Sequence, residues 1–106
     1  MFSEDTITFV KSAITSEFQH AVKNYGKSYN SNHESYAVLK EEIDEARDEL
    51  IQIQNRIYES WQLVKIDRDR LYKDEVAKMK EHAEALALEA CQIAAVCSKI
   101  LNGDCT

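Results

Sequence analysis

Residues 39–50 read LKEEIDEARDEL, a stretch in which six of twelve side chains are carboxylates. Leucine, isoleucine and alanine recur through it at three- and four-residue steps, which is the spacing of an amphipathic helix. At about 100° per residue, the carboxylates separate into two groups. One group flanks the apolar face: Glu42, Glu45 and Glu49. The other is expected to face water: Glu41, Asp44 and Asp48. By itself, such a run of charge is typical of a solvated helix face.

The composition predicts a single all-α domain over residues 1–106. The chain has no proline and only two glycines, and 30% of its residues are charged. A net charge of −6 argues against nucleic acid as a partner. No apolar run is long enough to span a membrane and no signal peptide is visible, so we expect a cytoplasmic protein without a membrane partner.

Three helices are expected. The first covers residues 4–25, with Ser3 as N-cap and Gly26 after its last residue. The second opens at Ser31 with a capping box completed by Glu34. Its break from the third helix is placed at residues 65–70, and the third ends at residues 102–103. The second helix carries a nearly heptad stripe that is predicted to be core: Tyr36, Leu39, Ile43, Ala46, Leu50, Ile53, Ile57, Trp61 and Val64.

The lengths of these helices predict self-association. The second and third helices would each be about 45 Å long at 1.5 Å per residue, and the first is too short to cover both. We therefore expect long antiparallel helices that complete a four-helix-bundle-type core as a homo-oligomer, either a dimer or a tetramer.

The third helix contains a single charge within an apolar segment. Residues 85–97 read ALALEACQIAAVC, where Glu89 is the one ionisable carboxylate and Gln92 lies three residues later. A buried carboxylate is costly unless it is paired or binds a metal. Glu89 could meet a lysine or arginine across an oligomer interface, or it could face Glu42 and Glu45 around a divalent cation. His82 could join that cluster, although a structural histidine is the simpler interpretation.

The segments EIDE (42–45) and EACQ (89–92) resemble the Glu-x-x-Glu … Glu-x-x-Asp pair of the all-α, MazG-like nucleoside triphosphate pyrophosphohydrolases. The surrounding residues 33–50 and 85–101 look like small phage- and prophage-type members of that superfamily. The resemblance covers roughly a third of the chain.

This resemblance implies a hydrolase that binds Mg²⁺, or Mn²⁺, and cleaves a nucleoside triphosphate to monophosphate and pyrophosphate. Glu42, Glu45 and Glu89 would be the catalytic metal ligands, and Gln92 would take the fourth ligand position. Two departures leave turnover open: Gln92 replaces an aspartate, and Glu45 and Glu89 are farther apart than the family usually shows. The alternative is a non-enzymatic helical oligomer that acts as an interaction or scaffold protein.

Overall fold

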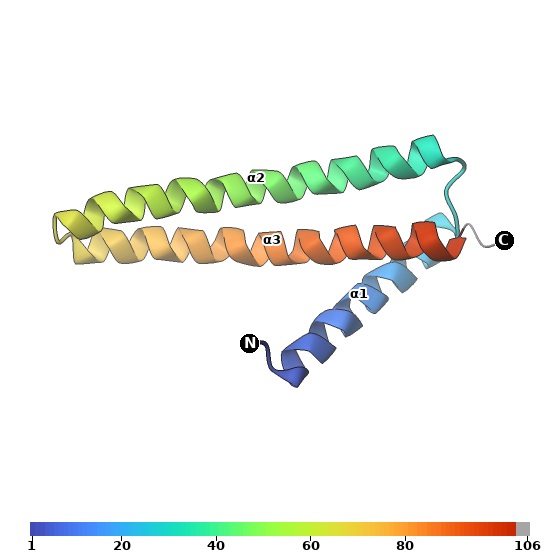
Figure 1. Cartoon of the computed structure of the whole chain (residues 1–106), viewed down its shortest axis with the longest axis horizontal. Coiled ribbons are helices and arrows are strands. Elements are labelled where there is room, and N and C mark those ends of the chain that lie inside the picture. The colour runs from blue at the N-terminus through green and yellow to red at the C-terminus, as the bar shows by residue number, and fades with distance from the viewer. Residues whose placement is uncertain (104–106) are drawn as a thin grey trace. The chain divides into compact units, whose positions relative to one another are not determined.

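The computed structural model describes residues 1–103, which form three helices: α1 (Glu4–Tyr25), α2 (Asn32–Lys65) and α3 (Asp69–Gly103) (Figure 1). No strand occurs within these residues. The all-α class and the approximate helix bounds predicted from the sequence are confirmed. None of the helices in the described part of the chain is both long and apolar enough to cross a membrane.

Local side chains set the first two helix starts. The Ser3 hydroxyl accepts a hydrogen bond from the N–H of Thr6 at 3.1 Å, as an N-cap does. Gly26 ends α1 with a φ of 91°, a left-handed value that glycine adopts without strain. At α2, Ser31 Oγ accepts from the N–H of Glu34 at 3.1 Å. The Glu34 carboxylate accepts from Asn30 instead of returning to Ser31, so only half of the predicted capping box forms.

The turn between α2 and α3 forms without glycine or proline. Asp67 takes the left-handed conformation, with a φ of 56°. The N–H of Asp67 bonds to the carbonyl of Val64 at 3.1 Å, and the N–H of Arg68 to that of Leu63 at 3.0 Å. This pair of bonds is a Schellman motif, which aspartate tolerates because its short side chain fits the left-handed region. The break falls where the sequence predicted it.

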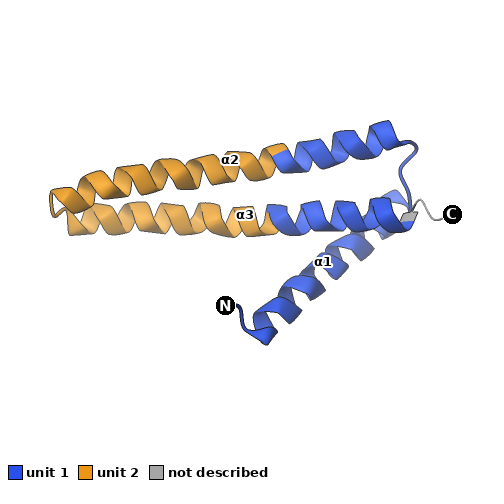
Figure 2. Cartoon of the chain, in the orientation of Figure 1, with its two compact units in different colours: residues 1–43, 89–106 blue, residues 44–88 orange. Residues whose placement is uncertain are grey.

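The chain divides into two compact units, shown in different colours in Figure 2. Unit 1 contains residues 1–43 and the chain from residue 89 onward. In it, α1 and the first turns of α2 pack with the last turns of α3. Ala95 and Val96 form its small apolar core, beside the buried polar side chains of Ser35 and Lys99.

Unit 2 contains residues 44–88, an antiparallel helical hairpin. Its two helices are joined by an ion pair between Arg56 and Glu75 at 3.3 Å. Ser60 lies between them and is 1% exposed. A serine at this position keeps the helix contact close but contributes little apolar burial.

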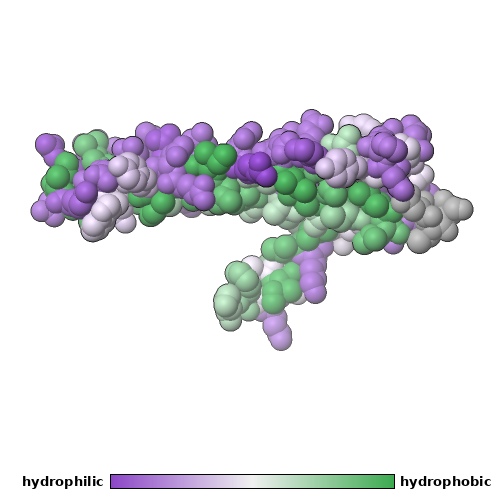
Figure 3. Space-filling view, turned by 45° about the horizontal axis from the view of Figure 1, so that its top comes forward, coloured by the Kyte–Doolittle hydropathy of each residue, from purple (hydrophilic) through white to green (hydrophobic). Residues whose placement is uncertain are grey.

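The stripe predicted to be the core of α2 is only partly buried. Leu39, Ala46 and Ile53 are half-buried. The other members are between 41% and 66% exposed: Tyr36, Ile43, Leu50, Ile57, Trp61 and Val64. The prediction for these six is therefore wrong within one chain. Neighbouring residues of α2 make the contacts with the rest of the chain. The apolar face formed by these six residues is therefore at the surface. Figure 3 shows hydrophobic residues at the surface on α1 as well.

Candidate metal site

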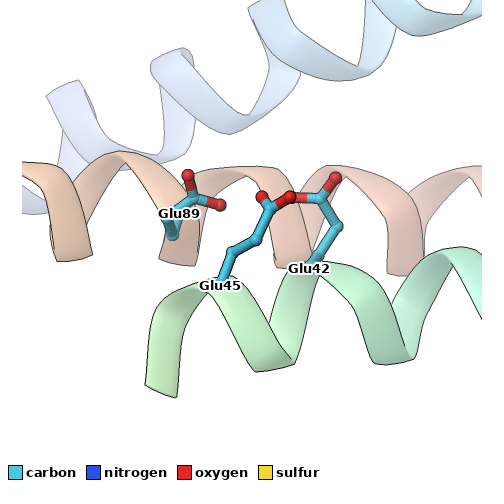
Figure 4. A group of neighbouring side chains, drawn as sticks. All are labelled: Glu42, Glu45 and Glu89. Atoms are coloured by element: carbon cyan, nitrogen blue, oxygen red, sulfur yellow. The ribbon is translucent and has the colours of Figure 1, made fainter. Parts of the chain in front are cut away.

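Three carboxylates from two helices converge in the structure. Glu42 and Glu45 project from successive turns of α2, and Glu89 projects toward them from α3 (Figure 4). One carboxylate oxygen from each residue can be chosen so that all three lie within 4.8 Å of one another. The proximity that the sequence suggested for these residues is thus present. We refer to Glu42, Glu45 and Glu89 as the acidic triad.

Helix geometry explains how the triad assembles. Residues three apart on a helix are neighbours on its surface, so Glu42 and Glu45 present adjacent side chains. Glu89 is carried by the apolar segment of α3, which the packing of unit 1 holds against α2. Glu42 and Glu89 are half-buried, whereas Glu45 is exposed. The triad therefore has a closed side and a side open to water.

The environment of Glu89 favours a cation. Its Oε2 atom is buried and has no hydrogen-bond partner among the described residues. A buried carboxylate oxygen without a donor loses its hydration and gains nothing in return. Two further carboxylates nearby add like-charge repulsion when all three are ionised.

The donor set fits a hard divalent cation. All three side chains offer oxygen, which Mg²⁺ and Mn²⁺ prefer over nitrogen or sulfur. Opposite ligands around Mg²⁺ are about 4.2 Å apart, twice the metal–oxygen bond length. The three triad oxygens lie within 4.8 Å of one another, so small side-chain adjustments would bring them onto one ion. Three protein ligands would leave positions for water or a substrate oxygen.

Gln92 has a partner that the sequence did not reveal. Its amide nitrogen donates a hydrogen bond to Oε2 of Glu17 on α1 at 2.6 Å. The amide oxygen is the atom that Gln92 could offer to a metal. Glu17 is therefore a further carboxylate of this region. Its position next to Phe18, in the apolar stripe of α1, is the one sequence feature that placed it near the packed face.

Glu49 and His82 form a separate pair in unit 2. His82 Nδ1 and Glu49 Oε2 are 2.7 Å apart, and both side chains are about 30% exposed. This contact favours the structural interpretation of His82. Glu41 and Asp48 are exposed, as expected, but Asp44 is half-buried and not fully in water as predicted.

A pocket of about 440 Å³ opens beside the triad within unit 1. Glu42 and Gln92 line it, together with Tyr29 and Lys99. Burial raises the pKa of the Tyr29 phenol, and the negative charges of Glu34 and Glu42 and the thiol of Cys97 raise this pKa further. Sequence reasoning did not identify Tyr29 or Lys99, because the loop and the helix end that carry them meet only in the folded chain.

Comparison of the chain with protein-family models, with curated proteins and with solved structures finds no match. The resemblance to MazG-like proteins therefore depends on the residues of the two acidic motifs and their flanks.

Proposed function

We propose that the acidic triad binds Mg²⁺ or Mn²⁺ and that the chain uses this cation to bind a nucleoside triphosphate and cleave it to monophosphate and pyrophosphate. The observation that carries the proposal is the buried, unpartnered Oε2 of Glu89 beside two carboxylates of α2. The Glu-x-x-Glu pattern of residues 42–45, with Glu89 on a later helix, supports the choice of substrate class.

Each member of the triad has a role in this proposal. Glu42 and Glu89, which are half-buried, hold the cation from the closed side. The cation neutralises phosphate charge and lowers the pKa of bound water. Glu45 lies on the open side, where one carboxylate oxygen completes the ligand set and the other positions a water molecule for attack and accepts its proton. The water oxygen forms a bond to the α-phosphorus while the bond to the α–β bridging oxygen breaks, and pyrophosphate leaves with that electron pair.

The test is pyrophosphate release from a panel of ribo- and deoxynucleoside triphosphates with Mg²⁺ or Mn²⁺. The variant Glu42→Gln with Glu89→Gln removes two ligand charges with little change in shape. Its matched control is Glu41→Gln with Asp48→Asn, which removes two exposed charges from α2. We expect release by wild type and control and none by the triad variant. Release that persists in the triad variant would contradict the proposal.

A second candidate function, assembly without catalysis, is favoured by the thin core. Among the described side chains, Ala95 and Val96 are the buried hydrophobic ones. The apolar residues at 43, 50, 57 and 64 recur every seventh position on α2, which is the spacing of a coiled-coil seam.

We propose that a second copy of the chain covers this α2 seam. A homo-oligomer is compatible with both functions, so the response to metal distinguishes them. If assembly is the whole function, Mg²⁺ leaves the melting temperature unchanged and no nucleotide is cleaved. If the triad binds the cation, the folded state is stabilised, and the melting temperature rises as the Mg²⁺ concentration increases above the Kd of the site.

A further inference from the structure

Lys99 is a buried cation of unit 1. Its side chain is on α3, one turn before the end of the described helix, and the residue is 3% exposed. Lysine is almost never buried this deeply unless its ammonium is paired. Among residues 1–103, the ammonium of Lys99 has neither an ion-pair nor a hydrogen-bond partner. Its three N–H donors therefore have no acceptor among the described residues, and Lys99 lines a pocket in which an acceptor could reach them.

The Tyr29 ring holds this ammonium in place. Lys99 Nζ lies 4.2 Å from the centroid of the ring, which is a cation–π contact. Such a contact fixes the position of the ammonium but leaves its N–H donors free to bind an anion. The Tyr29 ring therefore orients Lys99 without neutralising its charge.

Both side chains line the pocket of about 440 Å³ that also contains Glu42. Roughly 300–1,000 Å³ is the usual size of a small-molecule pocket. Glu34, another acidic residue of the lining, accepts hydrogen bonds from the backbone and side-chain amides of Asn30 at 3.3 and 3.0 Å. One wall of the pocket thus offers a carboxylate of the triad, and another offers an unpaired ammonium.

We propose that Lys99 binds oxygen atoms of the polyphosphate chain of a nucleoside triphosphate whose cation is held by the acidic triad. The assignment of the nucleotide rests on the proposed function. A phosphate is the acceptor that suits this site, because it supplies several charged oxygens to the N–H donors of one ammonium. A cation on Glu42 lowers the negative charge of the same pocket, so it should strengthen the binding of phosphate beyond what the Lys99 ammonium provides alone.

The test distinguishes phosphate binding by Lys99 from phosphate binding through the metal. Calorimetry measures tripolyphosphate binding in the presence of EDTA, and binding of an α,β-methylene nucleoside triphosphate with Mn²⁺. The variant Lys99→Met keeps an unbranched apolar stem and removes the charge. Lys23→Met removes the charge of an exposed lysine in the same unit and is the matched control. Lys99→Gln serves as a second variant if the methionine variant does not fold.

We expect the Lys99 variants to bind tripolyphosphate at least about tenfold more weakly, and Lys23→Met to bind as wild type does. Equal affinity in the Lys99 variants and the wild type would overturn the inference. Mn²⁺ binding is measured separately in each protein. Absence of Mn²⁺ binding by the wild type would contradict the proposed function alone. Absence of tripolyphosphate binding by the wild type in EDTA would overturn the inference about Lys99.

A measurement on the wild-type protein avoids substitution altogether. The ring current of Tyr29 displaces the NMR resonances of the Lys99 methylene beside its ammonium. We expect tripolyphosphate to shift these resonances as the ammonium engages phosphate. Resonances that stay in place at a tripolyphosphate concentration that saturates the calorimetric signal would contradict the proposal.

Discussion

Gln92 on α3 donates a 2.6 Å hydrogen bond to the carboxylate of Glu17 on α1. Both residues belong to unit 1, and both side chains are half-buried. The amide is the chemically matched partner for this carboxylate, because it donates a proton without carrying a charge. The glutamine that departs from the MazG-like pattern is thus complementary to a residue outside the motif.

Replacing this amide by a carboxylate should destabilise the fold. We predict that Gln92→Asp, measured in EDTA, lowers the free energy of unfolding by about 1.5–3 kcal/mol, the range for a lost hydrogen bond to a charged group. Two facing carboxylates add repulsion. Chemical denaturation measures the loss.

The reciprocal double variant provides the control for this prediction. Glu17→Gln with Gln92→Glu reverses the direction of the hydrogen bond and keeps one charge. It should recover most of the stability. A Gln92→Asp protein as stable as wild type would show that the contact with Glu17 contributes nothing.

The triad should destabilise the protein when no cation is present. We predict that Glu89→Gln raises the melting temperature in EDTA, because the neutral amide relieves repulsion and lowers the cost of burying an unpartnered oxygen. The free energy of unfolding should increase by about 1–3 kcal/mol, the cost of an unsatisfied buried group. Thermal denaturation followed by circular dichroism measures the shift.

Glu41→Gln is the matched control for this comparison, since Glu41 lies on the exposed side of α2, the helix that carries Glu42 and Glu45. It should change the melting temperature little. A decrease of the melting temperature in Glu89→Gln, with no change in the control, would mean that the Glu89 carboxylate stabilises the fold without a metal.

The helix ends and the composition of the triad could be predicted because their causes are local. The Ser3 cap, Gly26 and the three-residue step from Glu42 to Glu45 depend only on neighbouring residues. Glu89 was noticeable because its surroundings in the sequence are apolar. These features need no knowledge of tertiary packing.

Other features depend on which segments meet. Leu39, Ala46 and Ile53 alternate along α2 with Ile43, Leu50 and Ile57, so a heptad pattern alone did not decide which set faces α3. The contacts of Gln92 with Glu17 and of Lys99 with Tyr29 join segments that are distant in sequence. No short-range pattern marks such pairs.

The alkaline titration of Tyr29 should differ from that of an exposed tyrosine. Its pKa is raised above the usual value of about 10, chiefly by burial. The neutral phenol is therefore favoured in the folded state. The corresponding stability is complete below the unfolded pKa and is lost as the pH rises through the folded pKa.

Ultraviolet absorbance of the phenolate follows this titration in wild type and in Tyr29→Phe, which retains the ring. The chain has five tyrosines, and the most alkaline part of the titration should be absent in the variant. A titration curve that only loses amplitude uniformly would indicate that Tyr29 ionises as the other tyrosines do.

The exposed face of α2 should control association. We predict that Leu50→Lys with Ile57→Lys shifts the protein toward a monomer, because a charge on each half-exposed apolar position opposes burial in an interface. Light scattering after size-exclusion chromatography measures the mass. Gln54→Lys with Asn55→Lys, both at exposed polar positions, is the matched control for added positive charge. A monomeric wild type, or an unchanged mass in the Leu50 and Ile57 variant, would contradict the assignment of this face.

Mn²⁺ binding is the direct test of whether the acidic triad holds a cation. Electron paramagnetic resonance counts free and bound Mn²⁺ in wild type, in Glu89→Gln and in Glu41→Gln. We predict that wild type has one saturable Mn²⁺ site and that Mg²⁺ displaces Mn²⁺ from it. Glu41→Gln should retain this site, and Glu89→Gln should bind Mn²⁺ at least about tenfold more weakly. Mn²⁺ bound equally by all three proteins, or by none of them, would show that the acidic triad is not a metal site.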